Sequence, residues 1–150
     1  MRLYLIQHGK SLSKEEDPQR PLSKEGREET EKVAAFLKQK NLVVDFIWHS
    51  KKLRAAQTAQ IISVSITTQR IEERSDLNPL DPLDKLPQEL LNLNKDIMIV
   101  GHLPYLQKLS SLLLTGSEDS EPVSFVNSSV VCLEYKEKWA IAWYIAPGQL

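Results

Sequence analysis

The sequence has one cysteine, Cys132, almost no net charge and no long hydrophobic run. A single cysteine excludes an internal disulfide and any cysteine-rich zinc site. The formal net charge of -1 argues against a general nucleic-acid binder. The apolar run that begins the chain ends at Ile6 and is too short for a signal peptide or a membrane span. These features predict a cytoplasmic protein with neither a nucleic-acid nor a membrane partner.

Apolar runs recur along the 150 residues, each followed by a short polar loop and a helical pattern. Continuous apolar runs of this length are typical of strands buried on both faces of a parallel sheet. The length fits a single domain spanning 1–150, which can bury roughly 70% of its unfolded surface without disulfides or metals. The predicted strands are 3–6, 46–48 and 97–100, with a weaker strand at 66–71.

Helical spacing predicts helices in the gaps between these strands. Ser23 is an N-cap candidate for the first helix, the second begins after Ser50, and Pro104 occupies the first turn of a third that ends near Leu114. Three prolines predict a loop over 75–88, with a short helix beyond it. Thr115 to Pro122 is polar and acidic and predicts a loop.

The C-terminal segment carries two further strand patterns, 130–135 and 139–145, separated by Lys136-Glu137-Lys138. Two strands this close in sequence predict an antiparallel hairpin. Trp139 and Trp143 are predicted to lie on one face of the second strand, as core residues. The predicted fold is therefore α/β, a three-layer αβα sandwich with a mostly parallel central sheet and a C-terminal antiparallel hairpin.

Reactive residues follow each of the three strong strand patterns. The first strand leads into Gln7-His8-Gly9, the second into His49-Ser50 and then Arg54, and the third into Gly101-His102. Ligand sites in open α/β sheets lie outside the carboxyl ends of the strands, so these loops are predicted to converge on one crevice.

The combination of His8, His102 and Arg54 favours an anion over a metal, because a guanidinium would repel a bound cation. Phosphate is the anion that this set predicts: Arg54 can hold two of its oxygens, and helix N-termini offer free N–H groups. One imidazole can then attack phosphorus while the other donates to the oxygens. His49 is interpreted as a structural residue.

Four segments, in order, resemble signatures of the histidine phosphatase (phosphoglycerate-mutase-like) superfamily, and in particular its small bacterial phosphohistidine phosphatases. Leu5-Ile6-Gln7-His8-Gly9 resembles the strand that carries Arg-His-Gly in the family. The other three segments are Arg20-Pro21-Leu22-Ser23-x-x-Gly26, Ser50-Lys51-Lys52-Leu53-Arg54-Ala55-Ala56-Gln57-Thr58-Ala59 and Gly101-His102-Leu103-Pro104.

The resemblance implies a role for each matching position. His8 would be the phosphorylated nucleophile, while Arg54, His102 and Arg20 would hold the phosphoryl group. Gln7, Gly9, Lys10 and Ser50 complete the expected phosphate contacts. The family implies no metal and no cofactor.

Two positions depart from the family pattern. Gln7 stands where the family has arginine, and loss of one such charge-assisted contact costs on the order of 10²–10³ in rate. Lys10, just beyond Gly9, is predicted to restore the missing charge. Lys51 replaces the usual proline and adds a further positive charge.

The class of substrate that the sequence favours depends on whether it offers a general acid. Asp76, Asp81 and Asp84 are the candidates, and none matches a motif. Since imidazole leaves more easily than an alkoxide, the sequence favours a phosphohistidine on a protein over a small phosphate ester. A phosphoanion-binding domain with weak turnover is the alternative that Gln7 leaves open, and a sugar- or acid-phosphate mutase is a third. A monomer is expected.

Overall fold

The computed structural model describes all residues 1–150 and contains six strands, four α-helices and one short 3₁₀ helix. In chain order these elements are β1 (Arg2–Gln7), α1 (Lys24–Gln39), β2 (Val43–Ser50), α2 (Leu53–Ser63), β3 (Thr67–Arg74), α3 (Leu86–Leu93), β4 (Ile97–Gly101), α4 (Tyr105–Thr115), β5 (Val130–Tyr135), β6 (Trp139–Ile145) and η1 (Pro147–Gln149).

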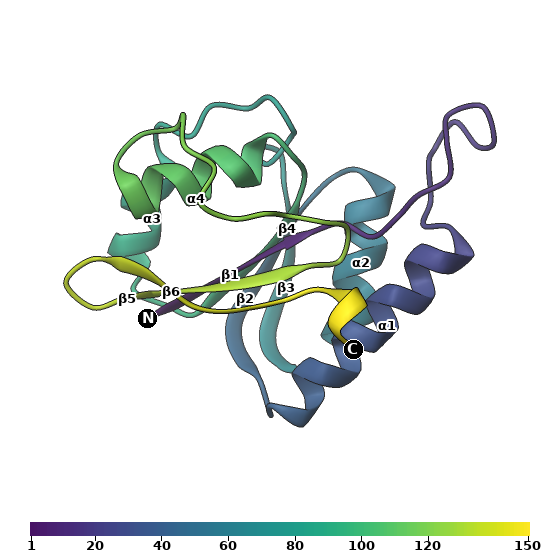
Figure 1. Cartoon of the computed structure of the whole chain (residues 1–150), viewed down its shortest axis with the longest axis horizontal. Coiled ribbons are helices and arrows are strands. Elements are labelled where there is room, and N and C mark those ends of the chain that lie inside the picture. Colours follow the sequence, from purple (N-terminus) through teal and green to yellow (C-terminus); the bar gives the residue numbers. More distant parts are fainter.

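All six strands form one sheet in the order β3-β2-β4-β1-β5-β6 (Figure 1). The first four strands in this order are mutually parallel, whereas β5 runs antiparallel to β1 and pairs with β6 in an antiparallel hairpin. The predicted mostly parallel α/β sheet with a C-terminal hairpin is confirmed. Because β1, β2 and β4 are parallel neighbours, their carboxyl ends meet at one edge of the sheet.

Helices cover both faces of the sheet, α1 and α2 on one and α3 and α4 on the other (Figure 1). Side chains alternate along β1, so Leu3 and Leu5 pack under α3 and α4 while Tyr4 and Ile6 pack under α1 and α2. All five residues of β4 are buried, as expected for a central strand covered on both faces. None of the helices could span a membrane.

The local signals at helix ends behave as predicted in α1. The Ser23 side chain accepts a hydrogen bond from the Gly26 N–H at 3.0 Å and caps the helix. β3 is longer than predicted and continues to Arg74, where Arg74 forms ion pairs with Asp76 and Glu89. α3 begins at Leu86, inside the predicted loop, because Pro87 fits the first turn of a helix.

The prediction that Trp139 and Trp143 share a face of β6 is wrong. Trp139 packs into the core beneath α3 and α4, whereas Trp143 packs against the core beneath α1 and α2. The pairing register between β5 and β6 shifts between Cys132 and Leu133. Such a bulge inserts one extra residue into β6 and reverses the alternation beyond it, which the sequence pattern does not reveal.

A close backbone approach fixes where the loop after β1 meets the start of α1. The Lys10 carbonyl accepts hydrogen bonds from the Ser23 N–H at 2.9 Å and from the Ser23 hydroxyl at 3.3 Å. A Cβ placed on Gly26 would lie 2.0 Å from that carbonyl oxygen. The glycine of the Arg-Pro-Leu-Ser-x-x-Gly segment is therefore required by packing of α1 against the loop that follows β1 and contains His8.

Replacement of Gly26 by alanine is expected to lower the free energy of unfolding by about 3 kcal/mol, because backbone atoms must separate to admit the methyl group. This corresponds to a fall in Tm of roughly 6–12 °C for a chain this size. Gly148→Ala is the matched control, since nothing lies within 4 Å of a Cβ at Gly148. Equal melting temperatures for the two variants would contradict the close approach.

Candidate active site

The loops after β1, β2 and β4 bring the predicted residues together at one edge of the sheet. The ring centroids of His8 and His102 are 5.0 Å apart, with a tilt of 54° between the planes. Main-chain pairing sets this distance, because Gln7 lies opposite Gly101 in the parallel ladder and the His8 N–H donates to the Gly101 carbonyl at 3.0 Å. His8 faces an open cavity of about 420 Å³, which Arg20 also lines.

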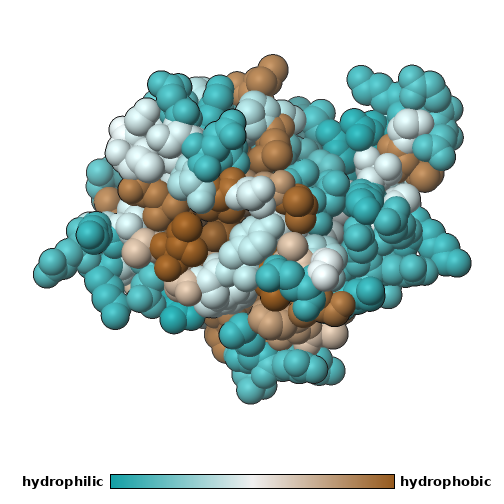
Figure 2. All heavy atoms as spheres, viewed as in Figure 1, coloured by the Kyte–Doolittle hydropathy of each residue, from teal (hydrophilic) through white to brown (hydrophobic).

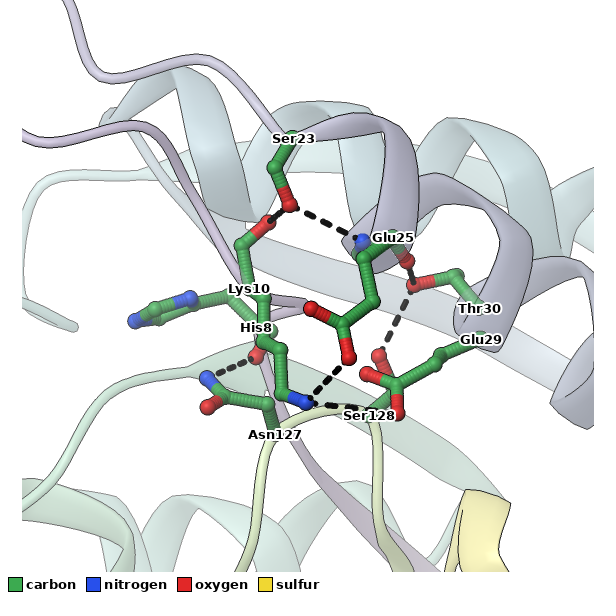
Figure 3. Close-up of polar contacts among 9 residues, drawn as sticks. His8, Lys10, Ser23, Glu25, Glu29, Thr30, Asn127 and Ser128 are labelled. Atoms are coloured by element: carbon green, nitrogen blue, oxygen red, sulfur yellow. Dashed lines mark hydrogen bonds and ion pairs between the residues drawn. The ribbon is translucent and has the colours of Figure 1, made fainter. Parts of the chain in front are cut away.

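The His8 ring is oriented by its own loop. His8 Nδ1 lies 2.7 Å from the Gly9 carbonyl oxygen, which can only accept, so Nδ1 carries the proton. Nε2 is then the nitrogen with a free lone pair, as a nucleophile requires. The His8 ring extends away from the polar network around Lys10 in Figure 3.

Two side chains that sequence reasoning did not single out hold the loop around His8. The Gly9 N–H donates to the Thr58 hydroxyl at 2.9 Å, and that hydroxyl donates to the Arg54 carbonyl at 2.8 Å. The Asn127 amide donates to the His8 carbonyl at 2.9 Å (Figure 3). Thr58 lies within the Gln-Thr-Ala segment, which offers a signal for it, whereas nothing in the local sequence marks Asn127.

His102 is buried, with 2% of its surface exposed, and is held by Ser50. Ser50 Oγ lies 2.6 Å from His102 Nε2 and accepts a weaker bond from the Lys52 N–H at 3.4 Å. Because the Lys52 N–H already donates to this hydroxyl, the arrangement that satisfies both groups has the hydroxyl donating to Nε2, with the proton of His102 on Nδ1. Nδ1 is buried without a partner, which leaves it as a donor for an oxyanion.

Burial keeps both histidines neutral at pH 7. It lowers the pKa of His8 to about 4, helped by the nearby charges of Arg54 and Arg20 and opposed by the bond to Gly9. Burial also lowers the pKa of His102 to about 3, and the interaction with His8 and the charges of Arg54 and Lys52 act in the same direction. A neutral His8 is the nucleophilic form, and a bound phosphate would offset the positive charges that surround both rings.

The two arginines supply the permanent positive charge of the site. Burial lowers the pKa of the Arg54 guanidinium and the charge of Arg20 lowers it further, so the two lie close enough to repel each other. Arg54 Nε is buried and has no partner. Arg20 adopts a positive φ of 51° and is held by Ser11 Oγ at 3.0 Å and the Leu12 carbonyl at 3.2 Å, which fixes its guanidinium at the cavity wall.

Lys10 lines the same cavity, but its ammonium group is already occupied. Lys10 Nζ lies 2.8 Å from a Glu25 carboxylate oxygen and 3.5 Å from one of Glu29 (Figure 3). This geometry gives no support to the expectation that Lys10 replaces the missing arginine charge. Gly9 and Ser50 also bind other residues of the protein: the Gly9 N–H donates to Thr58, and the Ser50 hydroxyl contacts His102. Both therefore help to position the two histidines.

Gln7 ends β1 beside the two histidines without contributing charge. Its backbone carbonyl accepts the Ser128 N–H at 2.9 Å, and its side-chain Oε1 is buried with no partner. An uncompensated amide oxygen at this position leaves the site one charge-assisted donor short of the pattern that the family carries.

None of the three candidate acids lines the cavity of His8. Asp76 forms two hydrogen bonds with Arg74, at 2.7 and 2.9 Å, and this contact holds the pKa of the Asp76 carboxyl below its usual range. Asp76, Asp81 and Asp84 line a separate cavity that contains no histidine. No group of three or more His, Cys, Asp or Glu side chains is arranged to hold a metal ion.

Comparison with known proteins identifies the family of this chain. Residues 3–82, more than half of the chain, match the histidine phosphatase superfamily (branch 1). The chain therefore belongs to this superfamily, and its enzyme class is a phosphatase. No curated protein matches the sequence.

Solved structures of phosphatases share the fold over nearly the whole chain. The protein histidine phosphatase SixA complexed with tungstate is 24% identical and has a TM-score of 0.87, with 99% of each chain covered. A SixA-type protein from Agrobacterium tumefaciens is 22% identical, with a TM-score of 0.79 and 97% of each chain covered. A phosphoserine phosphatase from Entamoeba histolytica in complex with phosphoserine is 19% identical, with a TM-score of 0.73 over 99% of this chain and 98% of that one.

Proposed function

We propose that this protein dephosphorylates phosphohistidine on another protein, through a phosphorylated His8 and without a metal or other cofactor. The observation that carries the proposal is the pair of neutral imidazoles, whose ring centroids are 5.0 Å apart, with two arginines near enough for their charges to lower the pKa of His8. Such a site offers a nucleophile, a buried donor and fixed positive charge, which are the parts that phosphoryl transfer requires.

In the first step the lone pair of His8 Nε2 attacks phosphorus, and the bond from phosphorus to the substrate imidazole breaks. The substrate ring leaves as neutral imidazole when its other nitrogen carries a proton, so no carboxylic acid is needed. Arg54, Arg20 and the His102 Nδ1–H hold the three equatorial oxygens as charge develops. Water then attacks the phosphorus of phospho-His8 and the bond from phosphorus to Nε2 breaks. The electron pair returns to Nε2, and the proton of the water passes to a phosphoryl oxygen, which gives inorganic phosphate and neutral His8.

Several observations support phosphohistidine over a phosphate monoester. An alkoxide leaving group needs a proton, and the carboxylates that line the His8 cavity, Glu16 and Glu25, are each engaged by another group of the protein. The Ser13 N–H lowers the pKa of Glu16, and Glu25 is paired with Lys10. SixA, described as a protein histidine phosphatase, has the same fold over 99% of the chain.

The free, buried Cys132 is consistent with the cytoplasm as the site of action.

Phosphate release is expected to be at least about 10²-fold faster, in kcat/KM, from a phosphohistidine peptide than from phosphoserine in the same peptide. The reason is the leaving group, since both peptides present the same phosphoryl group to His8. Steady-state assays of phosphate release measure this directly. Equal rates, or a preference for phosphoserine, would contradict the proposed substrate class and require a general acid.

Gln7 supports a second candidate, a domain that binds phosphorylated proteins and turns them over slowly. The amide carries no charge where the family has arginine, and its Oε1 is buried without a partner. The wild-type protein would then bind a phosphohistidine peptide without measurable phosphate release. The Gln7→Arg variant argued in the Discussion separates the two candidates.

A further inference from the structure

A second cavity of about 460 Å³ adjoins the one that His8 faces, and Arg20 lines both. One wall is the loop between β1 and α1, which stands out from the body of the molecule as a largely hydrophilic projection (Figures 1 and 2). The other wall is the start of α2. We call this cavity the basic groove; its lining residues are Lys14, Pro18, Gln19, Arg20, Lys51, Lys52, Leu53 and Arg54.

Five of the eight lining residues are cationic and none is acidic, in a chain whose formal net charge is -1. Lys14, Lys51 and Lys52 form no ion pair, in contrast to Lys10, which binds two glutamates. None of the loop's three acidic residues, Glu15, Glu16 and Asp17, lines the groove; Glu16 accepts from the Ser13 N–H and Asp17 from the Gln19 N–H. The lining of the groove is therefore wholly basic in charge, and its three lysines are not paired with carboxylates.

The start of α2 adds to this field. Lys52 makes no side-chain cap, and the first turn of α2 contains no acidic residue, so the positive end of the helix is open to the groove. The charge of Lys52 also reaches the catalytic centre, since it contributes to the lowered pKa of His102. An anionic chain lying in the groove would thus be close to the phosphoryl group bound at His8.

We propose that the basic groove binds an acidic segment of the phosphoprotein substrate, adjacent in its chain to the phosphohistidine. This inference rests on the proposed function and adds the substrate class: a phosphohistidine flanked by Asp or Glu. Lys14 and Lys51 are the specificity-determining residues, because both are exposed, unpaired and outside the catalytic cluster. Lys51, which stands where the family pattern has proline, adds its charge next to the N-terminus of α2.

The test compares two phosphohistidine peptides of equal length, one with four flanking glutamates and one with four glutamines. At low salt we expect wild type to prefer the acidic peptide by about tenfold in kcat/KM, and the preference to weaken at 0.5 M salt. The double variant Lys14→Glu/Lys51→Glu should lose this preference. Its kcat/KM for the neutral peptide should stay within about twofold of wild type, which also shows that the variant is folded.

The matched control is Lys95→Glu/Lys138→Glu, which makes the same change in net charge. These exposed lysines lie before β4 and between β5 and β6, at the opposite edge of the sheet, and form no ion pair. The control should retain the wild-type preference. A wild type that does not discriminate, or a preference that survives Lys14→Glu/Lys51→Glu, would overturn the inference.

Fluorescence anisotropy with the unphosphorylated acidic peptide separates this inference from the proposed function. If wild type releases no phosphate from any peptide, the proposed function fails. The groove is then judged by binding alone: about tenfold weaker affinity in Lys14→Glu/Lys51→Glu than in the control supports it, and equal affinities overturn it.

Discussion

His8→Asn is expected to lower kcat/KM for phosphate release by at least about 10³-fold, because the reaction then has no group to carry the phosphoryl intermediate. Asparagine preserves a polar side chain that can meet the Gly9 carbonyl, so the loop keeps its shape while the nucleophilic Nε2 is removed. Loss of activity should therefore occur with little loss of stability. Phosphate-release kinetics and thermal melting measure the two effects separately.

His49 provides a matched control for this substitution. His49 Nδ1 lies 2.8 Å from the carbonyl oxygen of the next residue, the same local contact that His8 makes with Gly9. His49→Asn should keep kcat/KM within about twofold of wild type. Comparable losses in both variants would show that the His8 effect is structural.

The intermediate itself can be trapped. Wild type mixed with a ³²P-labelled phosphohistidine peptide and quenched in base should carry label that is stable in base and released by acid, as phosphohistidine is. His8→Asn should carry none. Label on the His8→Asn protein, or turnover without any label on wild type, would exclude phospho-His8 as the intermediate.

The sequence predicts the fold well because its signals are local. Fully apolar runs such as 97–100 mark strands buried on both faces, and Ser23 marks the start of α1 through a single side-chain cap. The reversal of β6 at Trp143 could not be predicted in this way. It depends on a bulge in the pairing with β5, which is a property of two strands together.

The same distinction applies to the site. The positions of His8, His102 and Arg54 follow from a rule about parallel strands, and the structure brings them together. Lys10 shows the limit: its place after Gly9 suggested a phosphate ligand, yet Glu25 and Glu29, 15 and 19 residues further along the chain, hold its ammonium group. Partners that are remote in sequence decide what a charged side chain can do.

Gln7→Arg is expected to raise kcat/KM by about 10²-fold, because it adds a charge-assisted donor for the phosphoryl oxygens, on which negative charge develops. Gln7 lies opposite Gly101 in the ladder and directly precedes His8, so a longer side chain there starts beside both histidines. Phosphate-release kinetics with the phosphohistidine peptide test the gain. Gln7→Met controls for length, since it fills similar space without charge, and it should not raise the rate.

The added guanidinium is also expected to lower the stability of the protein, and this effect separates the charge of the new side chain from its size. Arg54 and Arg20 already repel each other, so a third arginine should lower stability by about 1–2 kcal/mol without ligand. In thermal melts, inorganic phosphate should recover most of this loss of stability in Gln7→Arg. It should change the melting temperature of Gln7→Met little. If wild type releases no measurable phosphate and Gln7→Arg restores release, the natural chain is a phosphoprotein-binding domain. The neutral amide of Gln7 would then allow binding without turnover. A measurable wild-type rate that Gln7→Arg leaves unchanged would mean that Arg54, Arg20 and His102 already stabilise the transition state without a charge at position 7.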